Sequence, residues 1–311
     1  MSVKINQKEG VTLDIVIPHL VFPQLEKTLR LLRANTPPCF RVILIDQSRN
    51  DNSYLQKEGL VDVIVKTKKN LGFAKACNTG LRISDAEYVM LLNDDVFLLS
   101  KTWLQDCMTV FRDRADAAAV NLSSPRNPHG GGGIVDQFPS EAAIERGYWT
   151  DEEIHQIKLI FDGVNTKPGC EQIYPAGCLY APIFKRSALE ALGKHAGSPY
   201  GIALLDESFG TGGGEDYHFV RSLGLIGLRF YGTYRAWGYH FWLSTRSMMK
   251  EAGYGEDAYQ TTKKGYDRFR ELWGSTHGKG PNDTPDGADV YGRSGPKEPL
   301  DGQPWFTVTP L

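Results

Sequence analysis

The stretch Asn70-Leu-Gly-Phe-Ala-Lys-Ala-Cys-Asn-Thr-Gly80, followed by Tyr88-Val-Met-Leu-Leu-Asn-Asp-Asp95, decides the fold of this chain. Its second half is a short apolar run, typical of a buried strand, and ends in the carboxylates of Asp94 and Asp95. Open α/β sheets bind ligands at the carboxyl ends of their strands. Buried acids are costly unless they are paired or bound to a cation, and a hard divalent cation that carries phosphates suits them. The alternative for both acids is a turn or a helix cap.

Strand and helix patterns alternate from residue 12 to about residue 122. The apolar runs that predict strands span residues 12–18, 41–46, 61–66, 87–93 and 117–122. Apolar positions at helical spacing predict helices over 23–34, 72–83 and 101–113, the last with Ser100 as its N-cap. This alternation predicts an α/β fold, with a doubly wound, mostly parallel sheet flanked by helices and joined by right-handed crossovers.

The regular alternation stops after residue 122, where Pro and Gly become frequent. Thr150-Asp-Glu-Glu153 is a capping-box pattern that opens a predicted helix over 151–160. We expect residues 123–172 to be an inserted helical and loop section. Beyond it, the sequence predicts strand-like segments at 175–182 and 226–233 and helices at 187–193, 216–223 and 257–274. The Gly- and Pro-rich tail, residues 276–311, is expected to be extended or partly disordered.

Composition and charge restrict the class of protein. The chain has 311 residues, a formal net charge of −2 and 41% hydrophobic residues, which is ordinary for a globular protein. This charge gives no support to wholesale binding of nucleic acid or anionic membrane. The five cysteines, at 39, 77, 107, 170 and 178, form no CxxC pair, which indicates free thiols in a reducing compartment. No segment resembles a signal peptide or reaches the ~20 apolar residues of a membrane helix. We therefore expect a cytoplasmic protein.

Three features supply side chains suited to chemistry. They are Asn93-Asp94-Asp95 at a strand end, Glu215-Asp216 after the glycines 212–214, and His240 in an aromatic segment. Active sites of α/β folds are assembled in this way from loops at one sheet edge. The alternatives stay open: capping of a helix for Glu215 and Asp216, and a core position for His240.

The ordered set of Pro18, Ile45-Asp46-Gln-Ser48, Asn70-Leu-Gly72, Asn78-Thr-Gly80, Asn93-Asp94-Asp95, Glu215-Asp216 and His240 resembles a family 2 glycosyltransferase of the GT-A fold. The resemblance covers about residues 12 to 245. It implies an inverting enzyme of the hexosyltransferase class, which moves a sugar from a nucleotide-diphosphate sugar, with UDP favoured, to an acceptor hydroxyl. It also implies a divalent metal, Mn²⁺ or Mg²⁺. The domains expected are a GT-A domain at 1–245, a helical segment packed on it at 246–275, and the tail.

The resemblance assigns roles residue by residue. Asp95 and His240 match metal ligands, and Asp216 matches the catalytic base. Glu215 is expected to face the acceptor or the helix N-terminus. The positions that match the donor-binding site are Pro18, His19, Asp46, Asn70, Lys75, Asn78, Asn93 and Asp94. Of these, Asp46 matches the residue that contacts the nucleobase. Asn93 departs from the family, which often has Asp there.

Several alternatives remain at the level of sequence. The acceptor could be a glycan, a lipid-linked glycan, or hydroxylated bases of phage-type DNA. A non-catalytic sugar-nucleotide-binding module would lack the base or the metal site, yet Asp95 and Asp216 are both present. A nicotinamide dehydrogenase is excluded because Pro18-His-Leu-Val-Phe-Pro23 is unlike the glycine motif of that class. Trp237 and Trp242 suit either sugar stacking or the core, and glycines 130–133 suit either a lid or a surface loop.

Overall fold

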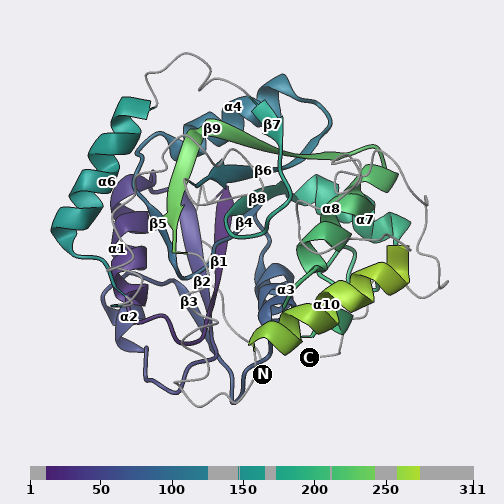
Figure 1. The fold of residues 1–311 in the computed structure, drawn as a ribbon, viewed down its shortest axis with the longest axis horizontal. Helices are drawn as coiled ribbons and strands as arrows, with labels where there is room; N and C mark the ends of the chain where they lie inside the picture. Colours follow the sequence, from purple (N-terminus) through teal and green to yellow (C-terminus); the bar gives the residue numbers. More distant parts are fainter. Residues whose placement is uncertain are drawn as a thin grey trace.

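The computed structural model describes residues 12–124, 146, 148–164, 173–210, 212–241 and 258–273 (Figure 1). Side chains are described for these residues except 160–164, 174–175 and 258–262. The predicted tail, glycines 130–133, Cys170 and Trp242 lie outside the described residues.

A nine-stranded sheet forms the centre of the molecule. Its strands are β1 Leu13–His19, β2 Phe40–Asp46, β3 Val63–Lys66, β4 Tyr88–Leu91, β5 Val96–Leu98, β6 Ala117–Ser123, β7 Ile173–Pro175, β8 Pro182–Lys185 and β9 Arg229–His240. They lie in the order β3-β2-β1-β4-β8-β6-β9-β5, and β7 pairs with β9. The pairs β1–β2, β1–β4, β2–β3 and β6–β9 are parallel and have the longer ladders, whereas the antiparallel pairs β4–β8, β5–β9, β6–β8 and β7–β9 each match only three residues, so the mostly parallel sheet is confirmed.

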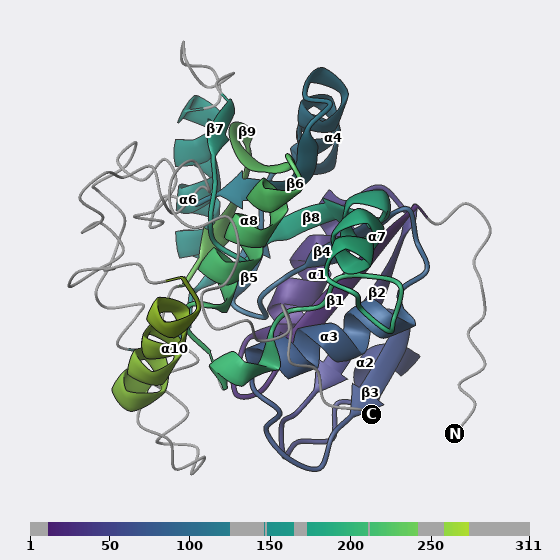
Figure 2. The ribbon, with the colours of Figure 1, turned by 90° about the vertical axis from the view of Figure 1, so that its right-hand side faces the viewer.

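Helices cover both faces of this sheet. They are α1 Leu25–Asn35, α2 Tyr54–Lys57, α3 Phe73–Ile83, α4 Trp103–Asp113, α6 Asp151–Val164, α7 Arg186–His195, α8 Glu215–Leu225 and α10 Ala258–Trp273, with a 3₁₀ turn, η1, at Glu207–Phe209. Figures 1 and 2 show α1 on one side of the sheet and α3, α7 and α8 on the other. Alternate residues of β1 supply the two cores: Ile15 and Ile17 pack with α1, and Val16 packs with α3. Strands buried on both faces have continuous apolar sequences, so their positions could be predicted from the sequence.

A glycine permits the closest contact between a helix and the sheet. A Cβ at Gly80 of α3 would lie 2.2 Å from the Cγ1 of Val16 in β1. No side chain therefore fits at position 80. The close approach fixes α3, and with it the segment that begins at Asn70, against the central strand.

Three local predictions need correction, and the direction of one strand, β8, was not predicted. The strand-like segment expected at 175–182 is instead an irregular stretch, 176–181, between β7 and β8. β8 runs antiparallel to both of its neighbours, β4 and β6, because the chain returns to the sheet from the inserted section. The strand expected at 226–233 begins at Arg229 and continues to His240, because it pairs with β6 and then with β5. The N-cap of α4 is Thr102 rather than Ser100.

The shortest elements were not predicted from the sequence, whereas the capping box of α6 was. The loop after β2 contains the four-residue helix α2, and the residues after Asp95 form the three-residue strand β5. The capping box is confirmed, since the amide of Glu153 donates to the Oγ1 of Thr150 at 3.2 Å and the amide of Thr150 donates to the Glu153 carboxylate at 2.8 Å. Elements of three or four residues carry too little periodicity to be recognised.

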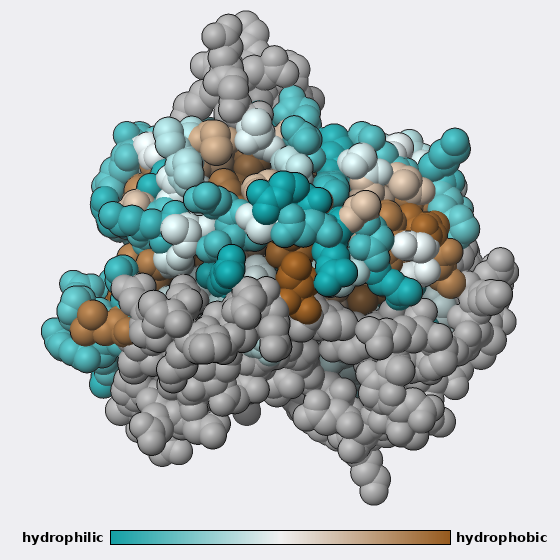
Figure 3. Space-filling view, turned by 90° about the horizontal axis from the view of Figure 1, so that it is seen from above, coloured by the Kyte–Doolittle hydropathy of each residue, from teal (hydrophilic) through white to brown (hydrophobic). Residues whose placement is uncertain are grey.

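The surface mixes polar and apolar residues. Large exposed hydrophobic residues, Tyr54, Tyr148, Leu159 and Tyr200, come from separate parts of the chain. On the face in Figure 3, brown hydrophobic residues form small areas between teal hydrophilic ones. Among the helices that the structure describes, none combines the length and the apolar character required to cross a bilayer.

Candidate active site

The predicted site residues lie at the carboxyl ends of the parallel strands. His19, Asp46 and Lys66 end β1, β2 and β3, and the register pairs His19 with Asp46 and Asp46 with Lys66. After β4 the chain turns at Asn93 and continues into β5, which is antiparallel to β9 with Val96 opposite His240. This pairing brings the end of β9 beside the Asn93-Asp94-Asp95 turn, although the two segments are far apart in sequence.

Asp95 and His240 face each other. The Oδ1 of Asp95 lies 3.2 Å from the Nε2 of His240, and the amide of Phe241 donates to the carbonyl of Asp95 at 3.1 Å. Both side chains are buried, with 4% of Asp95 and 7% of His240 exposed. The Nδ2 of Asn93 is 3.5 Å from the same Nε2, and the Oδ1 of Asn93 is a buried acceptor without a hydrogen-bond partner.

The chemistry of these atoms fits a divalent cation. A carboxylate, an imidazole and an amide oxygen form a donor set that suits Mn²⁺, and the buried Asn93 oxygen is satisfied by a hydrogen-bond donor or a cation. Within the described residues, no group of three or more His, Cys, Asp and Glu side chains could hold a metal. Asp95, His240 and Asn93 would therefore provide part of a coordination shell, with oxygen atoms of a donor diphosphate and water completing it.

Asp94 and His19 form a second buried pair. The Nδ1 of His19 is 2.7 Å from the Oδ2 of Asp94, and the Oγ1 of Thr28 donates to the carbonyl of Asp94 at 2.7 Å. Burial raises the pKa of Asp94, the hydrogen bond with His19 opposes this shift, and the charge of Asp95 adds to it. The pair connects the end of β1 to the Asn93-Asp94-Asp95 turn.

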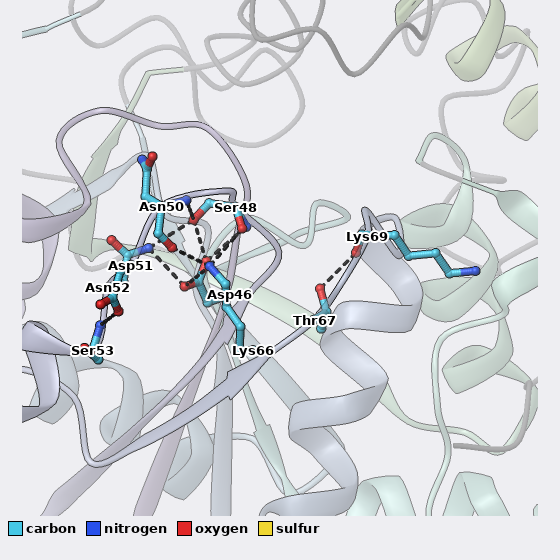
Figure 4. Close-up of polar contacts among 9 residues, drawn as sticks. All are labelled: Asp46, Ser48, Asn50, Asp51, Asn52, Ser53, Lys66, Thr67 and Lys69. Atoms are coloured by element: carbon cyan, nitrogen blue, oxygen red, sulfur yellow. Dashed lines mark hydrogen bonds and ion pairs between the residues drawn. The ribbon is translucent and has the colours of Figure 1, made fainter.

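Asp46 lies inside a dense polar network, shown in Figure 4. Its Oδ1 accepts from the amide and hydroxyl of Ser48 at 3.0 and 2.7 Å, and its Oδ2 accepts from Asn52 at 3.1 Å and from the Nζ of Lys66 at 2.9 Å. Lys66 also donates to the carbonyls of Ser48 and Asn50. Burial raises the pKa of Asp46, but the hydrogen bonds from Ser48 and Lys66 outweigh it and lower that pKa below its ordinary value. The carboxylate thus organises the loop after β2.

The remaining donor-binding candidates differ in how many of their polar atoms already bond to other parts of the protein. Asn78 is fully buried, and its amide group bonds to Leu205 N, Leu205 O and Glu207, at 2.7, 2.8 and 3.0 Å. These bonds brace α3 against η1. The Oδ1 of Asn70 accepts from Gly72 N at 2.8 Å and shapes the turn before α3. Lys75 is half-buried on α3, and Pro18 is buried in β1. Contact of these residues with a donor stays a prediction.

Glu215 and Asp216 open α8 behind a left-handed glycine. The N-cap is Gly214, with a φ of 89°, a conformation that glycine adopts without strain. The carboxylate of Glu215 is buried and accepts from the amide of Gly213, so it holds the loop. Asp216 is the more exposed of the two acids. Burial and then the charge of Asp216 raise the pKa of Cys178.

Helix α10 packs directly on this glycine loop. A Cβ at Gly265 would lie 1.7 Å from the carbonyl oxygen of Gly213, and a Cβ at Gly214 would lie 3.0 Å from that of Gly265. The indole of Trp273 donates to the Nδ1 of His218 in α8 at 3.0 Å. Helix α10 therefore reaches the residues before Asp216.

The structure also shows functional neighbours that sequence reasoning missed. Tyr180 stacks on His240, Asp216 adds to the rise in the pKa of Cys178 that burial causes, and Lys66 lies beside Asp46. Residues 178 and 180 lie in the segment expected to be a strand, and no motif marks them. Trp237 packs with Phe97 and other apolar residues and is buried, so its core interpretation is confirmed.

A family model and several solved structures are similar to this chain. Residues 15–163 match the family model of glycosyl transferase family 2. These residues form a glycosyl transferase family 2 domain, so the chain is a glycosyltransferase. The match includes the predicted donor-binding residues from Pro18 to Asp94 and the predicted metal ligand Asp95, whereas Glu215, Asp216 and His240 lie beyond it. No curated protein sequence matches this glycosyltransferase.

Solved structures similar to the glycosyltransferase have low sequence identity. GalNAc-T7 with UDP, GalNAc and Mn²⁺ has a TM-score of 0.54 and 15% identity, over 84% of this chain and 48% of that one. A mannosyltransferase from Pyrobaculum calidifontis in complex with GDP-Man and Mn²⁺ has a TM-score of 0.47 and 14% identity, over 83% and 69%. TarS from S. aureus has a TM-score of 0.48 and 15% identity, over 83% of this chain and 43% of that one. The likeness to GalNAc-T7 shows the GT-A fold.

Proposed function

We propose that this glycosyltransferase is an inverting, metal-dependent enzyme that moves a sugar from a UDP-sugar to an acceptor hydroxyl. The observation that carries the proposal is the meeting of Asp95 and His240, at 3.2 Å, at the sheet edge where GT-A folds bind ligands. The choice of UDP is supported by the likeness in fold to GalNAc-T7, whose solved structure contains UDP and Mn²⁺.

Asp95, His240 and Asn93 would hold the divalent cation. When bound, Mn²⁺ or Mg²⁺ supplies positive charge that stabilises a departing diphosphate. Asp216, the more exposed acid of α8, takes the proton of the acceptor hydroxyl as it attacks the anomeric carbon. A general base in this position contributes about 10²–10⁴-fold to the rate. Glu215 keeps the glycine loop in place, because its carboxylate is already bonded to Gly213.

We propose a sugar hydroxyl of a glycan or lipid-linked glycan as the acceptor. A net charge of −2 gives no broad positive field for DNA. We also propose a cytoplasmic location. The cysteines at 39, 77, 107 and 178 are free thiols, as in proteins of a reducing compartment.

A thermal-shift series tests the donor and the metal together. The melting temperature is measured with UDP, dTDP, GDP and CDP, each with and without Mn²⁺, in the wild type and in Asp95→Ala. A ligand that binds only the folded state adds about 2.7 kcal/mol at 100 times its Kd. We expect UDP with Mn²⁺ to give the largest shift, and Asp95→Ala to lose its metal-dependent part. Stabilisation by another nucleotide would refute UDP, and equal shifts with and without metal in the wild type would refute the metal site.

A further inference from the structure

Tyr180 lies between two parts of the proposed metal site. Its ring stacks on the imidazole of His240, with ring centroids 4.8 Å apart and planes 14° from parallel. Only 2% of Tyr180 is exposed. Offset aromatic rings at this separation attract each other, and a ring that is itself enclosed by the core restricts the rotation of its neighbour. The imidazole of His240 is therefore held in one orientation from its flat side.

Tyr180 is anchored at both of its ends. Its phenol oxygen donates to the carbonyl of Leu122 in β6, and its own carbonyl accepts from the amide of Asn93 at 2.8 Å. Through its ring it contacts His240, and through its main chain it contacts the turn that carries Asp95. One residue thus joins the two segments whose side chains would bind the cation.

The segment around Tyr180 is fixed to the sheet. The Nδ2 of Asn121 in β6 donates to the carbonyl of Cys178 at 2.8 Å, and the amide of Ala176 donates to the carbonyl of Phe230 in β9 at 3.0 Å. Residues 176–181 are irregular in conformation, yet these bonds attach them to two strands. The position of the Tyr180 ring is consequently set by the sheet.

The spacing of the two candidate ligands already suits a cation. Bonds of about 2.1 Å at right angles, as around Mg²⁺, place two ligand atoms about 3 Å apart. The Oδ1 of Asp95 and the Nε2 of His240 are 3.2 Å apart. A site that holds this spacing before the metal arrives loses less free energy to ordering when it binds.

We propose that Tyr180 is a positioning residue that sets the orientation of His240 toward Asp95 and thereby the metal affinity of the site. This inference rests on the proposed function, because it takes His240 and Asp95 as metal ligands. The aromatic ring is the part that acts, since the main-chain bond to Asn93 N persists with any residue at position 180.

Three substitutions separate the ring from the hydroxyl. Tyr180→Phe keeps the stacked ring and loses the bond to Leu122, whereas Tyr180→Leu and Tyr180→Met lose the ring. Met is included because its flexible side chain fills irregular gaps, so it keeps a folded variant available. Phe184→Leu is the matched control: Phe184 is a buried aromatic residue of β8 that packs on Phe219 and Phe230 rather than on His240.

The first readout is the Kd of Mn²⁺ at a fixed, saturating UDP concentration, measured by the paramagnetic resonance signal of free Mn²⁺. Loss of a residue that orients a metal ligand typically weakens binding about 10–100-fold. We expect this loss in Tyr180→Leu and Tyr180→Met, and a change of less than about threefold in Tyr180→Phe and Phe184→Leu. The second readout is the NMR signal of the His240 ring protons in the metal-free protein, which should shift when the stacked ring is removed and stay in Tyr180→Phe.

The outcomes distinguish the inference from the proposed function. Wild-type Mn²⁺ affinity in folded Tyr180→Leu or Tyr180→Met, together with lost affinity in Asp95→Ala, would overturn the role of Tyr180 and leave the metal site intact. An equal loss in Phe184→Leu would also overturn it, because general loosening of the core would then explain the effect. Retained affinity in Asp95→Ala itself would refute the metal site.

Discussion

Asp94 and Asp95 are adjacent in sequence but have different partners. Asp95 faces His240, whereas Asp94 is paired with His19 at 2.7 Å. The two carboxylates therefore do not act as one cluster. Asp95 is available to a cation beside Asn93, and Asp94 fixes the turn to β1. A sequence shows two acids at a strand end, and only their partners show which of them is suited to a metal.

Replacement of Asp216 by Asn tests the proposed base. The amide has nearly the same shape but cannot accept a proton, so we expect transfer to fall about 10²-fold or more, with an unchanged thermal shift from UDP and Mn²⁺. The rate is measured with a donor and an acceptor found active for the wild type. Asp113→Asn, at the end of α4, is the control and should keep full activity. Full activity in Asp216→Asn would remove this residue from the mechanism.

Asp46 gives a prediction about pH and stability. Its folded-state pKa is lowered, so it stabilises the fold above its unfolded pKa of about 3.9. This contribution is lost as the pH falls through the folded pKa. We expect Asp46→Asn to be about 1–3 kcal/mol less stable near neutral pH, because buried donors lose their acceptor, and the difference should shrink below about pH 4. Urea unfolding of both proteins across this range measures it, and a difference that grows on acidification would contradict the assignment.

At the scale of elements, the site depends on contacts between backbones. Gly213 of the glycine loop and Gly265 of α10 touch so closely that a Cβ at 265 would overlap the carbonyl of 213. The family match ends at residue 163, so α10 lies well beyond it. Helix α10 nevertheless lies against the residues just before Asp216, and its packing residues Phe269 and Trp273 are buried with Tyr217 of α8.

Gly265→Ala tests this contact. The added methyl group must displace the loop before Asp216, and a small displacement of a catalytic group can cost a large part of the rate. We expect kcat to fall at least about tenfold with little change in the UDP thermal shift. The matched control is Gly193→Ala in α7, whose Cβ would lie 2.4 Å from the carbonyl carbon of Ile202, outside the site. Equal losses of kcat in folded samples of both variants would show that the contact has no special role.

At the scale of the whole molecule, the candidate site and a buried ion-pair cluster lie at opposite ends of the sheet. The site lies at the carboxyl ends of β1, β2 and β4. At the amino ends, Arg41 makes two hydrogen bonds to the fully buried Asp14, at 2.8 and 2.7 Å, and one to Asp85 at 2.7 Å. This clamp joins β1 to β2 where the strands begin.

Arg41→Met should destabilise the protein by about 3–5 kcal/mol, because it leaves the Asp14 carboxylate buried without its cation. Adding Asp14→Leu should recover much of that loss, since a well-packed apolar pair removes the buried charge. Chemical unfolding measures both effects. The specific activity of folded Arg41→Met should equal that of the wild type, and a specific loss of kcat in the folded protein would show that the two ends are coupled.

The fold could be predicted well where periodicity is strong. The strands that became β1, β2, β3, β4 and β6 lie within a few residues of their predicted positions, because short continuous apolar runs bounded by polar residues are typical of strands buried on both faces. The direction of β8 and the pairing of β5 with β9 could not be predicted. Both depend on where the chain returns to the sheet after the inserted section, which no local pattern encodes.

The sequence by itself determined the α/β class, the family resemblance, and the residues Asp95, Asp216 and His240 as candidates, since these follow from residue type and order along the chain. The tertiary structure alone decided that Asp95 meets His240 while Asp94 meets His19, that Lys66 bonds to Asp46, and that Tyr180 stacks on His240. The physical reason is that such contacts join segments far apart in the chain. They are set by strand register and close packing, which a single residue's identity does not specify.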